Sequence, residues 1–348
     1  MKVLYFGIYD PNFSRNRIYI SGLRQNGVEV IECRDSSPGF RKYWRLWRKH
    51  RAVHDQYDAL VVGYPGHLVV PLARMISKKP IIADLLGSLT DAEVNSRGAG
   101  LARRFKSEIA DRPAVWFADV VLLESEAQKA YFIERFGESK KYKVLYTGAD
   151  DSVFFCLRDH GAAPKDSFIV LFRGRLTPES GITYILEAAR LLKDDARIRF
   201  RIIGFGQLLE EVKRIISCDS LTNVELIAEL LPEDELRRKM CEASVSLGQF
   251  EDNPRLSRTI PHKAFESMAM GIPYVTGDAL AVREVVTDEK TGFFVPLANP
   301  EALSEEIRSA AMNTERLKLI SGAAYTLFKE RFSSHSLGAE LNRILSKK

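Results

Sequence analysis

The chain has 348 residues, of which 45% are hydrophobic and 28% charged, and its formal net charge is +5. This composition is typical of a globular protein and excludes a disordered chain, and the length favours two domains over one. The four cysteines form no C-x-x-C pair, no apolar run reaches the ~18 residues that span a bilayer, and no signal peptide opens the chain, so we expect a cytoplasmic protein without disulfides or a structural zinc site.

Short β-branched runs alternate with helical patterns along the chain. Several of these runs are apolar on both faces, as in a buried parallel sheet. The pattern breaks between Gly148 and Asp166, which predicts a linker, and then starts again. Helical patterns at about 300–311, 316–331 and 334–346 close the chain. The expected strands are Val3–Phe6, Val28–Glu32, Ala59–Val62, Ile81–Ala83, Val120–Leu123, Lys143–Tyr146, Phe168–Phe172, Phe200–Ile203, Val224–Ile227, Ser244–Leu247, Tyr274–Thr276 and Phe293–Val295.

This alternation predicts an α/β fold of two doubly wound, Rossmann-like domains that face each other across a cleft. We expect an N-terminal domain over residues 1–155 and a C-terminal domain over residues 156–332. The last helix, within residues 333–348, is expected to pack back on the N-terminal domain.

Polar side chains follow the strands that are expected in the first half. Ligands of open parallel sheets bind beyond the carboxyl ends of the strands, so these positions are candidate contacts for a substrate. Asp84 comes directly after a strand and is the candidate for catalysis, whereas a lone loop histidine such as His67 is as readily a solvated side chain. The other candidates on this side are Asp10, Arg15 and Ser88.

The most informative stretch runs from Thr259 to Pro273 and has the sequence TIPHKAFESMAMGIP. Pro261 suits the first position of a helix. Lys263 and Glu266 are three residues apart and so share a helix face. Near the start of a helix, the lysine would meet a phosphate and the carboxylate would accept hydrogen bonds from ribose hydroxyls. An ordinary surface ion pair between the two residues explains the same spacing.

Other segments agree with this stretch in order and spacing. They are Val144–Asp150 with Phe154, Phe172–Gly181 (FRGRLTPESG), Ile203–Gly206 (IGFG), Phe265–Val275, Arg283–Glu284 and Thr291–Phe293. Together they resemble family 4 retaining glycosyltransferases, whose fold is GT-B. The resemblance covers essentially the whole chain and is strongest over residues 144–296. Its specificity lies in the joint order of the segments, because a G-x-G after a strand is common.

Two positions depart from the usual pattern of that family. The family has two glutamates separated by seven residues, but the partner position of Glu266 holds Arg258. The lysine that usually precedes the glycine of the phosphate-binding turn is Ser180 here. Arg255, Arg258 and Lys263 would supply the missing positive charge, in line with a subgroup whose motif has the form R-x-I-P-x-K-x-F-E. Loss of donor affinity is the alternative.

The resemblance implies transfer of a sugar from a UDP- or GDP-sugar to a hydroxyl, with retention of configuration and with the leaving diphosphate taking the acceptor proton. Arg175 and Lys263 would neutralise the charge that develops on the diphosphate, so we expect no metal and no cofactor beyond the nucleotide-sugar co-substrate. With Asp84, they are the expected catalytic residues. The donor-binding residues are expected to be Gly7, Arg175, Gly204, Gly206, Arg258, Lys263, Glu266 and Glu284.

Some alternatives remain open at this point. Gly204 and Gly206 either let the backbone approach the nucleoside or serve a tight turn, and Glu284 either contacts the donor or pairs with Arg283. A sugar-nucleotide 2-epimerase shares the two-domain architecture, although it would need acid and base side chains in the cleft. A non-catalytic GT-B-like protein with a degenerate donor site is the third candidate.

The first 51 residues hold 11 Lys/Arg and 4 Asp/Glu, and most of this excess lies in the segment GFRKYWRLWRKHR, residues 39–51. A basic amphipathic helix with tryptophan can lie in a membrane interface, where each cation contributes ~1 kcal/mol on an anionic surface. The expected membrane-facing residues are Arg41, Trp44, Arg45, Trp47, Arg48 and Lys49. The acceptor would then be lipid-linked or a cell-envelope glycan, and the enzyme would sit at the inner face of the membrane. Alternatively, the aromatic side covers the sheet and only the basic side is solvated. No nucleic-acid motif accompanies the segment.

Overall fold

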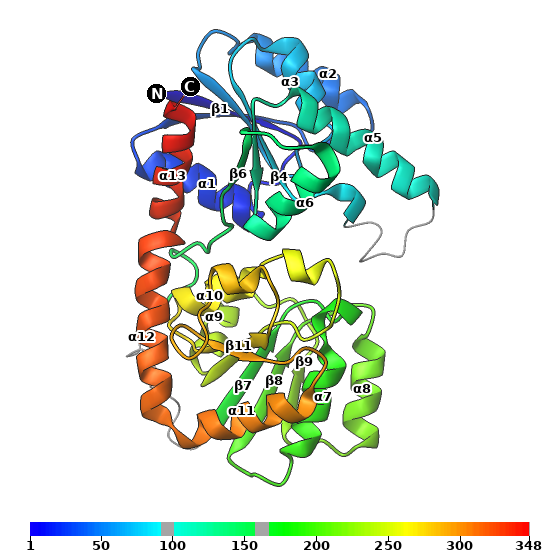
Figure 1. The fold of residues 1–348 in the computed structure, drawn as a ribbon, viewed down its shortest axis with the longest axis vertical. Helices are drawn as coiled ribbons and strands as arrows, with labels where there is room; N and C mark the ends of the chain where they lie inside the picture. Colours follow the sequence, from blue (N-terminus) through cyan, green and yellow to red (C-terminus); the bar gives the residue numbers. More distant parts are fainter. Residues whose placement is uncertain (92–100, 157–166, 348) are drawn as a thin grey trace. The chain divides into compact units, whose positions relative to one another are not determined.

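The computed structural model describes residues 1–91, 101–156 and 167–347, with the backbone alone over residues 101–107. Internal contacts divide the chain into two units (Figure 1). Unit 1 comprises Met1–Asp150 and Arg331–Lys348, and unit 2 comprises Asp151–Glu330. The sequence placed the first boundary five residues later and the second two residues later, because a pattern break shows where regular structure stops and not where contacts change. Part of the expected linker, residues 157–166, lies outside the described residues.

Unit 1 is built on a parallel sheet whose strand order is β2-β1-β3-β4-β5-β6 among the described residues. Its inner strands are apolar on both faces because helices cover both sides. The strands are β1 (Lys2–Gly7), β2 (Glu29–Arg34), β3 (Ala59–Val62), β4 (Ile81–Leu86), β5 (Val120–Leu123) and β6 (Tyr142–Val144).

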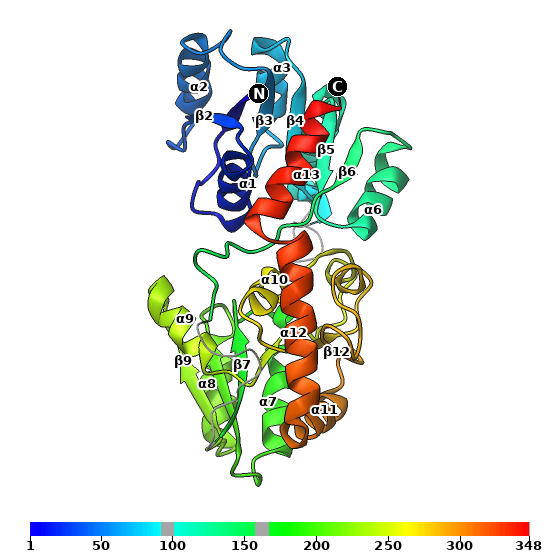
Figure 2. The same ribbon diagram turned by 90° about the vertical axis from the view of Figure 1, so that its left-hand side faces the viewer.

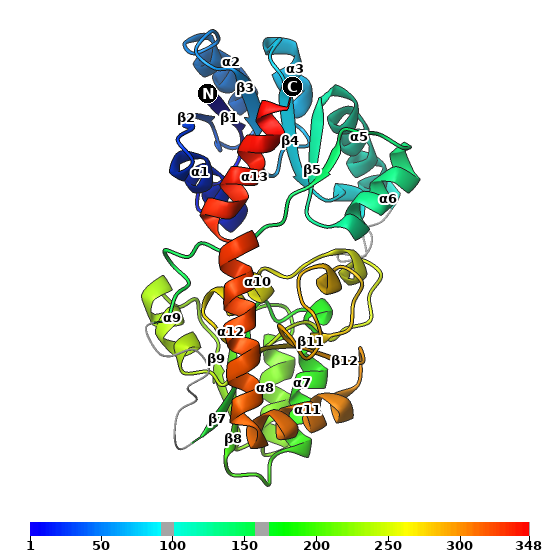
Figure 3. The ribbon, with the colours of Figure 1, turned by 60° about the vertical axis from the view of Figure 1, so that its left-hand side comes forward.

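The helices of unit 1 form two layers, each with its own apolar core. One layer contains α2 (Arg41–Arg51), α3 (Val70–Ile76), α5 (Leu101–Phe117) and α6 (Glu126–Phe136). The other contains α1 (Ser14–Gln25) and α13 (Ser334–Ser346), which lie side by side in Figure 2 and Figure 3. The end of the chain therefore completes the core of the first unit. Ser333 caps α13, since its hydroxyl accepts a hydrogen bond from the amide of Ser336.

Unit 2 repeats the plan with a parallel sheet of order β12-β11-β10-β7-β8-β9 in its described residues. The strands are β7 (Phe168–Arg173), β8 (Ile198–Ile203), β9 (Val224–Ile227), β10 (Val245–Leu247), β11 (Tyr274–Gly277) and β12 (Phe293–Val295). The helices are α7 (Ile182–Leu191), α8 (Leu209–Cys218), α9 (Glu233–Cys241), α10 (His262–Ala269), α11 (Pro300–Met312) and α12 (Thr314–Arg331). Short 3-10 turns η1 (Pro178–Ser180), η2 (Leu256–Arg258) and η3 (Val282–Glu284) lie between them.

Each expected strand is present, with ends that differ by at most three residues. The α/β class and the two doubly wound units are thus confirmed. The two sheets could be recognised because buried parallel strands are short, continuous apolar runs, and here they alternate with longer helical patterns. Among the described residues, none of the helices combines the length and the hydropathy needed to cross a bilayer.

The contact between α1 and α13 yields a stability prediction. A Cβ on Gly338 would lie 2.1 Å from the backbone carbon of Gly22, whereas a Cβ on Gly322, in α12, would meet nothing within 4 Å. We expect Gly338→Ala to destabilise the protein by about 2–3 kcal/mol through overpacking, and Gly322→Ala to stabilise it by about 0.5–1 kcal/mol through helix propensity. Urea unfolding of both variants checks this, and equal effects would contradict the close packing of α1 on α13.

Candidate active site

The carboxyl end of β7 is the centre of the candidate site in unit 2. The strand has the sequence FIVLFR, so an apolar run ends on a cation, Arg173, and continues into Gly174. Gly174 has a φ of +155°, and a Cβ there would come within 3.2 Å of the ammonium nitrogen of Lys263. The glycine thus lets a side chain from α10 reach the end of the strand.

Lys263 lies in the first turn of α10 and extends to β7. Its Nζ is 4.0 Å from the ring centroid of Phe172, a cation–π contact, and donates to the carbonyl of Gly248 at 3.3 Å. Within the described part of the chain, no acidic side chain pairs with it. Burial, with a further contribution from the positive charge of Arg173, lowers the pKa of Lys263 from 10.5 to about 7. The ammonium is therefore held where an anion would stabilise it.

Glu266 is one turn further along α10 and is almost fully buried. Its carboxylate forms an ion pair with Arg173, whose pKa is lowered to about 10 by burial. The guanidinium carbon of Arg173 also lies 5.6 Å from the ring centroid of Phe154. The expected spacing of Lys263 and Glu266 on one helix face is correct, but the surface ion pair between them is wrong, because Glu266 pairs with a residue of β7.

The turns after β7 and β8 are held together by their backbones. The amide of Gly174 donates to the carbonyl of Ile203, and the amide of Leu176 donates to that of Phe205. A Cβ on Gly204 would lie 2.0 Å from the carbonyl oxygen of Gly174, and one on Gly206 would lie 2.4 Å from that of Leu176. Both glycines are therefore explained by the close packing of two turns, which places the loop of Arg173 and Gly174 firmly beside α10.

The remaining donor candidates of unit 2 are distributed around this centre. Arg175 is exposed, and its side chain makes no ion pair or hydrogen bond within the described residues. Arg258 ends η2 and Glu284 ends η3, and both are half-buried. Arg283 forms an ion pair with Asp278, so the alternative in which Glu284 pairs with Arg283 is wrong. Ser180 is buried, and its hydroxyl donates to the carbonyl of Thr177 at 2.6 Å.

Sequence reasoning missed Arg173. The available signal was a cation at the end of an otherwise apolar strand, directly before a glycine. The structure brings two cations together at this end of the sheet, Arg173 from β7, which is paired with Glu266, and Lys263 from α10. A site with two cations and one carboxylate can bind a diphosphate and a neighbouring hydroxyl group.

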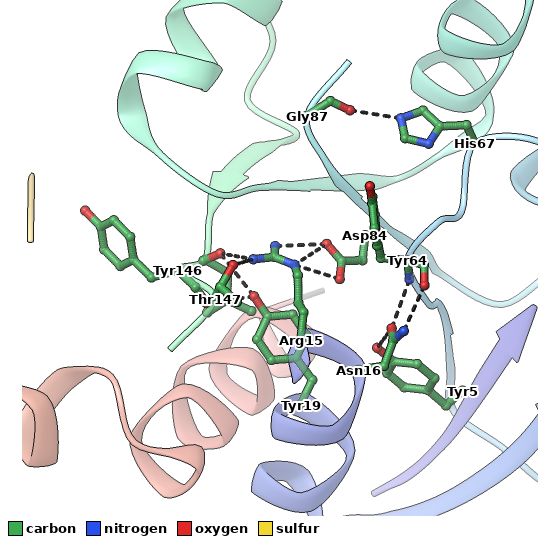
Figure 4. A network of polar contacts seen from close by, with 11 residues as sticks. Tyr5, Arg15, Asn16, Tyr19, Tyr64, His67, Asp84, Gly87, Tyr146 and Thr147 are labelled. Carbon is green, nitrogen blue, oxygen red and sulfur yellow. Dashed lines mark hydrogen bonds and ion pairs between the residues drawn. The ribbon is translucent and has the colours of Figure 1, made fainter. Parts of the chain in front are cut away.

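In unit 1, two of the candidate polar residues, Arg15 and Asp84, lie in a buried network (Figure 4). The guanidinium of Arg15 donates to both carboxylate oxygens of Asp84 at 2.9 Å, and to the carbonyl of Leu145 and the hydroxyl of Thr147 at 3.0 Å. Burial acts to lower the pKa of Arg15, but the charge of Asp84 outweighs it and holds that pKa above its ordinary value. Tyr19 donates to the carbonyl of Leu145 at 3.1 Å. The network ties α1, β4 and the segment after β6 together.

His67 and Ser88 lie on the other side of β4 and are also buried. His67 Nε2 is 2.9 Å from the carbonyl of Gly87, and the Ser88 hydroxyl donates to Asp111 of α5 at 2.6 Å. Burial lowers the pKa of His67 despite the nearby carboxylate of Asp111, so the ring is neutral at pH 7 and Nε2–H is the donor. Its Nδ1 has no hydrogen-bond partner among the described residues.

These contacts correct the assignment of four residues. Arg15, His67, Asp84 and Ser88 were expected to face an acceptor, and Asp84 was expected to be catalytic, but all four side chains lie in the interior and hold elements of unit 1 together. Ionisable residues that follow a strand look the same in a sequence whether they face solvent or each other. Asp10 is exposed after β1, and its Oδ1 accepts a hydrogen bond from the amide of Asn12 at 2.9 Å.

Gly7, a donor candidate, ends β1 with a φ of +140°. Its carbonyl accepts a hydrogen bond from the amide of Asp35 at 3.1 Å, which continues the pairing of β1 with β2. The backbone conformation explains the glycine here, and a Cβ would meet only ordinary contacts at 3.8 Å.

Comparison with known proteins bears on the site that unit 2 carries. Residues 167–313, which include β7, α10 and their turns, match the family model described as Glycosyl transferases group 1. The chain is similar to the amylovoran biosynthesis glycosyltransferase AmsK of Erwinia amylovora, with 24% identity over 309 residues, 80% of this chain and 74% of that protein. The protein is a glycosyltransferase.

Two further comparisons support the same class and fold. The GDP-mannose-dependent alpha-(1-6)-phosphatidylinositol monomannoside mannosyltransferase of Mycolicibacterium smegmatis is 25% identical to the glycosyltransferase over 298 residues, 81% of this chain and 74% of the relative. The crystal structure of Anabaena Alr3699/HepE in complex with UDP and glucose superposes with a TM-score of 0.76 at 18% identity, over 100% of both chains. This structural likeness establishes the GT-B fold of the glycosyltransferase.

The pair of Arg15 and Asp84 yields a prediction that separates a structural role from a catalytic one. We expect Arg15→Met and Asp84→Leu each to destabilise the enzyme by about 3–5 kcal/mol, because each leaves an uncompensated buried charge. The double variant should be destabilised by less than the sum of the two single-variant effects. Urea unfolding in a double-mutant cycle measures the coupling. Lost turnover by Asp84→Asn at wild-type stability would instead support direct contact with substrate.

Lys263 yields a prediction of pH dependence. A diphosphate would favour the protonated amine, whose pKa is about 7 in the free protein, while the phosphate oxygens are already ionised above pH ~6. We expect the affinity for UDP or GDP to fall as the pH rises from 7 to 9, by up to about tenfold per pH unit. Calorimetry should show weak, pH-independent binding by Lys263→Met and wild-type behaviour by the exposed control Lys193→Met.

The stability effect of the same lysine has the opposite sign. Between pH 7 and 10.5 the unfolded chain keeps a proton on Lys263 that the folded chain has lost, so this residue makes stability rise with pH in that window. Lys263→Met removes that slope and should be at least as stable as the wild type at pH 7. A destabilised variant at neutral pH would show that the buried ammonium is structurally compensated.

Proposed function

We propose that this glycosyltransferase moves a sugar from a nucleotide-diphosphate donor to a hydroxyl acceptor with retention of anomeric configuration, as family 4 enzymes do. The bond between the anomeric carbon and the diphosphate oxygen breaks, and its electron pair leaves on the diphosphate. The acceptor oxygen bonds to the same face of that carbon, and its proton passes to the diphosphate. No protein nucleophile is needed, and the catalytic demand is stabilisation of the leaving group.

The observation that carries this proposal is the placement of Lys263. Its amine is part-buried over Phe172, has no acidic partner in the described structure, and stands beside a second cation, Arg173. A diphosphate in this position would relieve the desolvation of the amine and gain a charge-assisted contact. Because such contacts strengthen as charge develops on the leaving group, they accelerate transfer, and we propose that no metal is required.

Glu266 would bind the ribose of the donor. Its carboxylate is oriented by the ion pair with Arg173, and its remaining lone pairs can accept hydrogen bonds from hydroxyl groups. Arg175, in the loop that follows β7, is exposed and forms no ion pair within the described ranges, and it is the further cation proposed for the diphosphate. We propose a UDP- or GDP-sugar as donor, with support from the UDP-bound Anabaena structure and from the GDP-mannose-dependent relative. We propose a role in glycan biosynthesis, with support from the amylovoran relative; a cytoplasmic location stays a prediction.

A substitution of Glu266 tests the proposal. Glu266→Ala would leave Arg173 without its partner, so Glu266→Gln is the sharper variant, since it keeps the shape and removes the charge. We expect Glu266→Gln to weaken UDP or GDP binding at least tenfold, in line with the ~1.5–3 kcal/mol of a hydrogen bond to a charged group. Glu210→Gln, at an exposed position of α8, is the matched control and should bind as the wild type does.

Product analysis distinguishes the candidate functions. A transferase releases nucleoside diphosphate only when an acceptor hydroxyl is present, and its product keeps the donor's anomeric configuration. Release without acceptor, together with an altered sugar, would support an epimerase, and absence of UDP and GDP binding would support a degenerate donor site. Turnover in excess chelator checks the absence of a metal requirement.

A further inference from the structure

The helix α2 is anchored to unit 1 by one side only. Leu46 and His50, one turn apart, are its fully buried residues. His50 Nε2 is 2.7 Å from the hydroxyl of Tyr57, which donates to Ser77 Oγ at 2.8 Å. This polar chain fixes the rotation of the helix about its axis, and so it also fixes which residues point outward.

The outward side of α2 carries aromatic rings. At about 100° per residue, Trp44 is on the side opposite Leu46, and Phe40 and Trp47 lie next to it, both on the same side of Trp44. Their exposed fractions are 89% for Phe40, 55% for Trp44 and 37% for Trp47. Tyr43 packs against the core of unit 1, but the alternative that the aromatic side covers the sheet is wrong for Phe40, Trp44 and Trp47. Three large rings that are exposed side by side on one helix indicate a surface that another body covers.

The same side carries arginines without acidic partners. Arg41, Arg48 and Arg51 are exposed, and none of them forms an ion pair in the part of the chain that the structure describes. Arg48 lies over the ring of Trp44 at 5.2 Å, and Arg51 lies over that of Trp47 at 5.1 Å. These cation–π pairs place positive charge directly beside apolar surface.

Arg45 and Lys49, the other two cations of α2 that were expected to face a membrane, have partners within unit 1. Arg45 donates to Ser37 Oγ at 2.7 Å, and Lys49 pairs with Asp35 at 3.1 Å. They hold the helix to the loop after β2 and contribute less to an external surface. The outer face of α2 is thus defined by Phe40, Arg41, Trp44, Trp47, Arg48 and Arg51.

We propose that the outer face of α2 docks on an anionic lipid bilayer. Its guanidinium groups would bind lipid phosphates, and its indole and phenyl rings would enter the headgroup region, where tryptophan is favoured. The helix contains no acidic residue, so a negatively charged surface meets no repulsion along its length. A flat bilayer also suits rings that project from one convex helix. Resting on the proposed function, this implies an acceptor hydroxyl on a membrane lipid or lipid-linked glycan.

Vesicle binding tests the proposal without any need for transfer. The full-length enzyme is sedimented with vesicles of phosphatidylcholine alone or of phosphatidylcholine and phosphatidylglycerol in equal parts. We expect binding to the anionic vesicles only, weakening as salt rises. R41E/R48E/R51E should lose at least tenfold in binding. The charge-matched control K193E/R214E/R238E, at exposed positions of unit 2, should bind as the wild type does.

A second variant tests the rings. Trp116 is the third tryptophan of the chain and is also exposed, so W116F leaves both remaining indoles on α2. In that background we expect a blue shift of fluorescence on anionic vesicles and quenching by brominated lipids. W44S should weaken vesicle binding severalfold with unchanged circular dichroism. Unquenched indoles would overturn insertion of the rings.

Other outcomes overturn the docking proposal. Wild-type enzyme that ignores anionic vesicles, or R41E/R48E/R51E that binds them normally, would refute it. Binding to single-stranded RNA in place of vesicles would assign the face to nucleic acid. UDP or GDP affinity should be unchanged in every α2 variant, so loss of vesicle binding and loss of the donor site are separate results.

Discussion

The unbalanced positive charge at the end of β7 is the constraint on which the function of unit 2 depends. Arg173 is neutralised by Glu266, but Lys263 is held beside them over Phe172 with no carboxylate of its own among the residues that the structure describes. Burial of the Lys263 ammonium without an anionic partner is unfavourable in the free protein, and for this reason the pKa of Lys263 is lowered to about 7. The turns after β7 and β8 pack closely, with Gly204 and Gly206 against backbone atoms of Gly174 and Leu176. This packing keeps the end of β7 in place beside α10.

The two units treat buried charge in opposite ways. In unit 1, Arg15 is satisfied by Asp84 and by two oxygens of the segment after β6, and the result is a closed, balanced network. In unit 2, Lys263 is left one anion short. A buried ion pair whose charges cancel helps to specify one fold. A buried cation without an anionic partner instead favours binding of a ligand that carries the missing negative charge. The same residue types therefore have different roles, and the difference lies in whether their partners are inside the protein.

The strands of both sheets could be predicted from the sequence, but the candidate site residues could be predicted only in part. Continuous apolar runs such as FIVLFR can be recognised because burial on both faces requires them. The role of Arg173 could not be predicted, since Glu266 lies far along the chain and only the fold brings the two together. Asp84 was misassigned for the same reason: the sequence predicts that it follows a strand, whereas it lies within β4, and the arginine that pairs with it is not recognisable as its partner. Helical periodicity found the basic aromatic segment of α2, and only the packing of Leu46 shows which side is free.

Net charge has to be interpreted by location for the same reason. The excess of cations lies at the start of the chain, yet the lysine proposed to meet the diphosphate belongs to the other half. On α2, exposed arginines lose little by staying solvated until a polyanionic surface is near, so they suit reversible docking whose strength depends on salt. At Lys263, the charge is already desolvated, so its partner has to be a single, well-placed anion. The exposed arginines of α2 therefore suit attraction to a charged surface, and the desolvated Lys263 suits recognition of a donor. A count of charged residues does not distinguish these two kinds of cation.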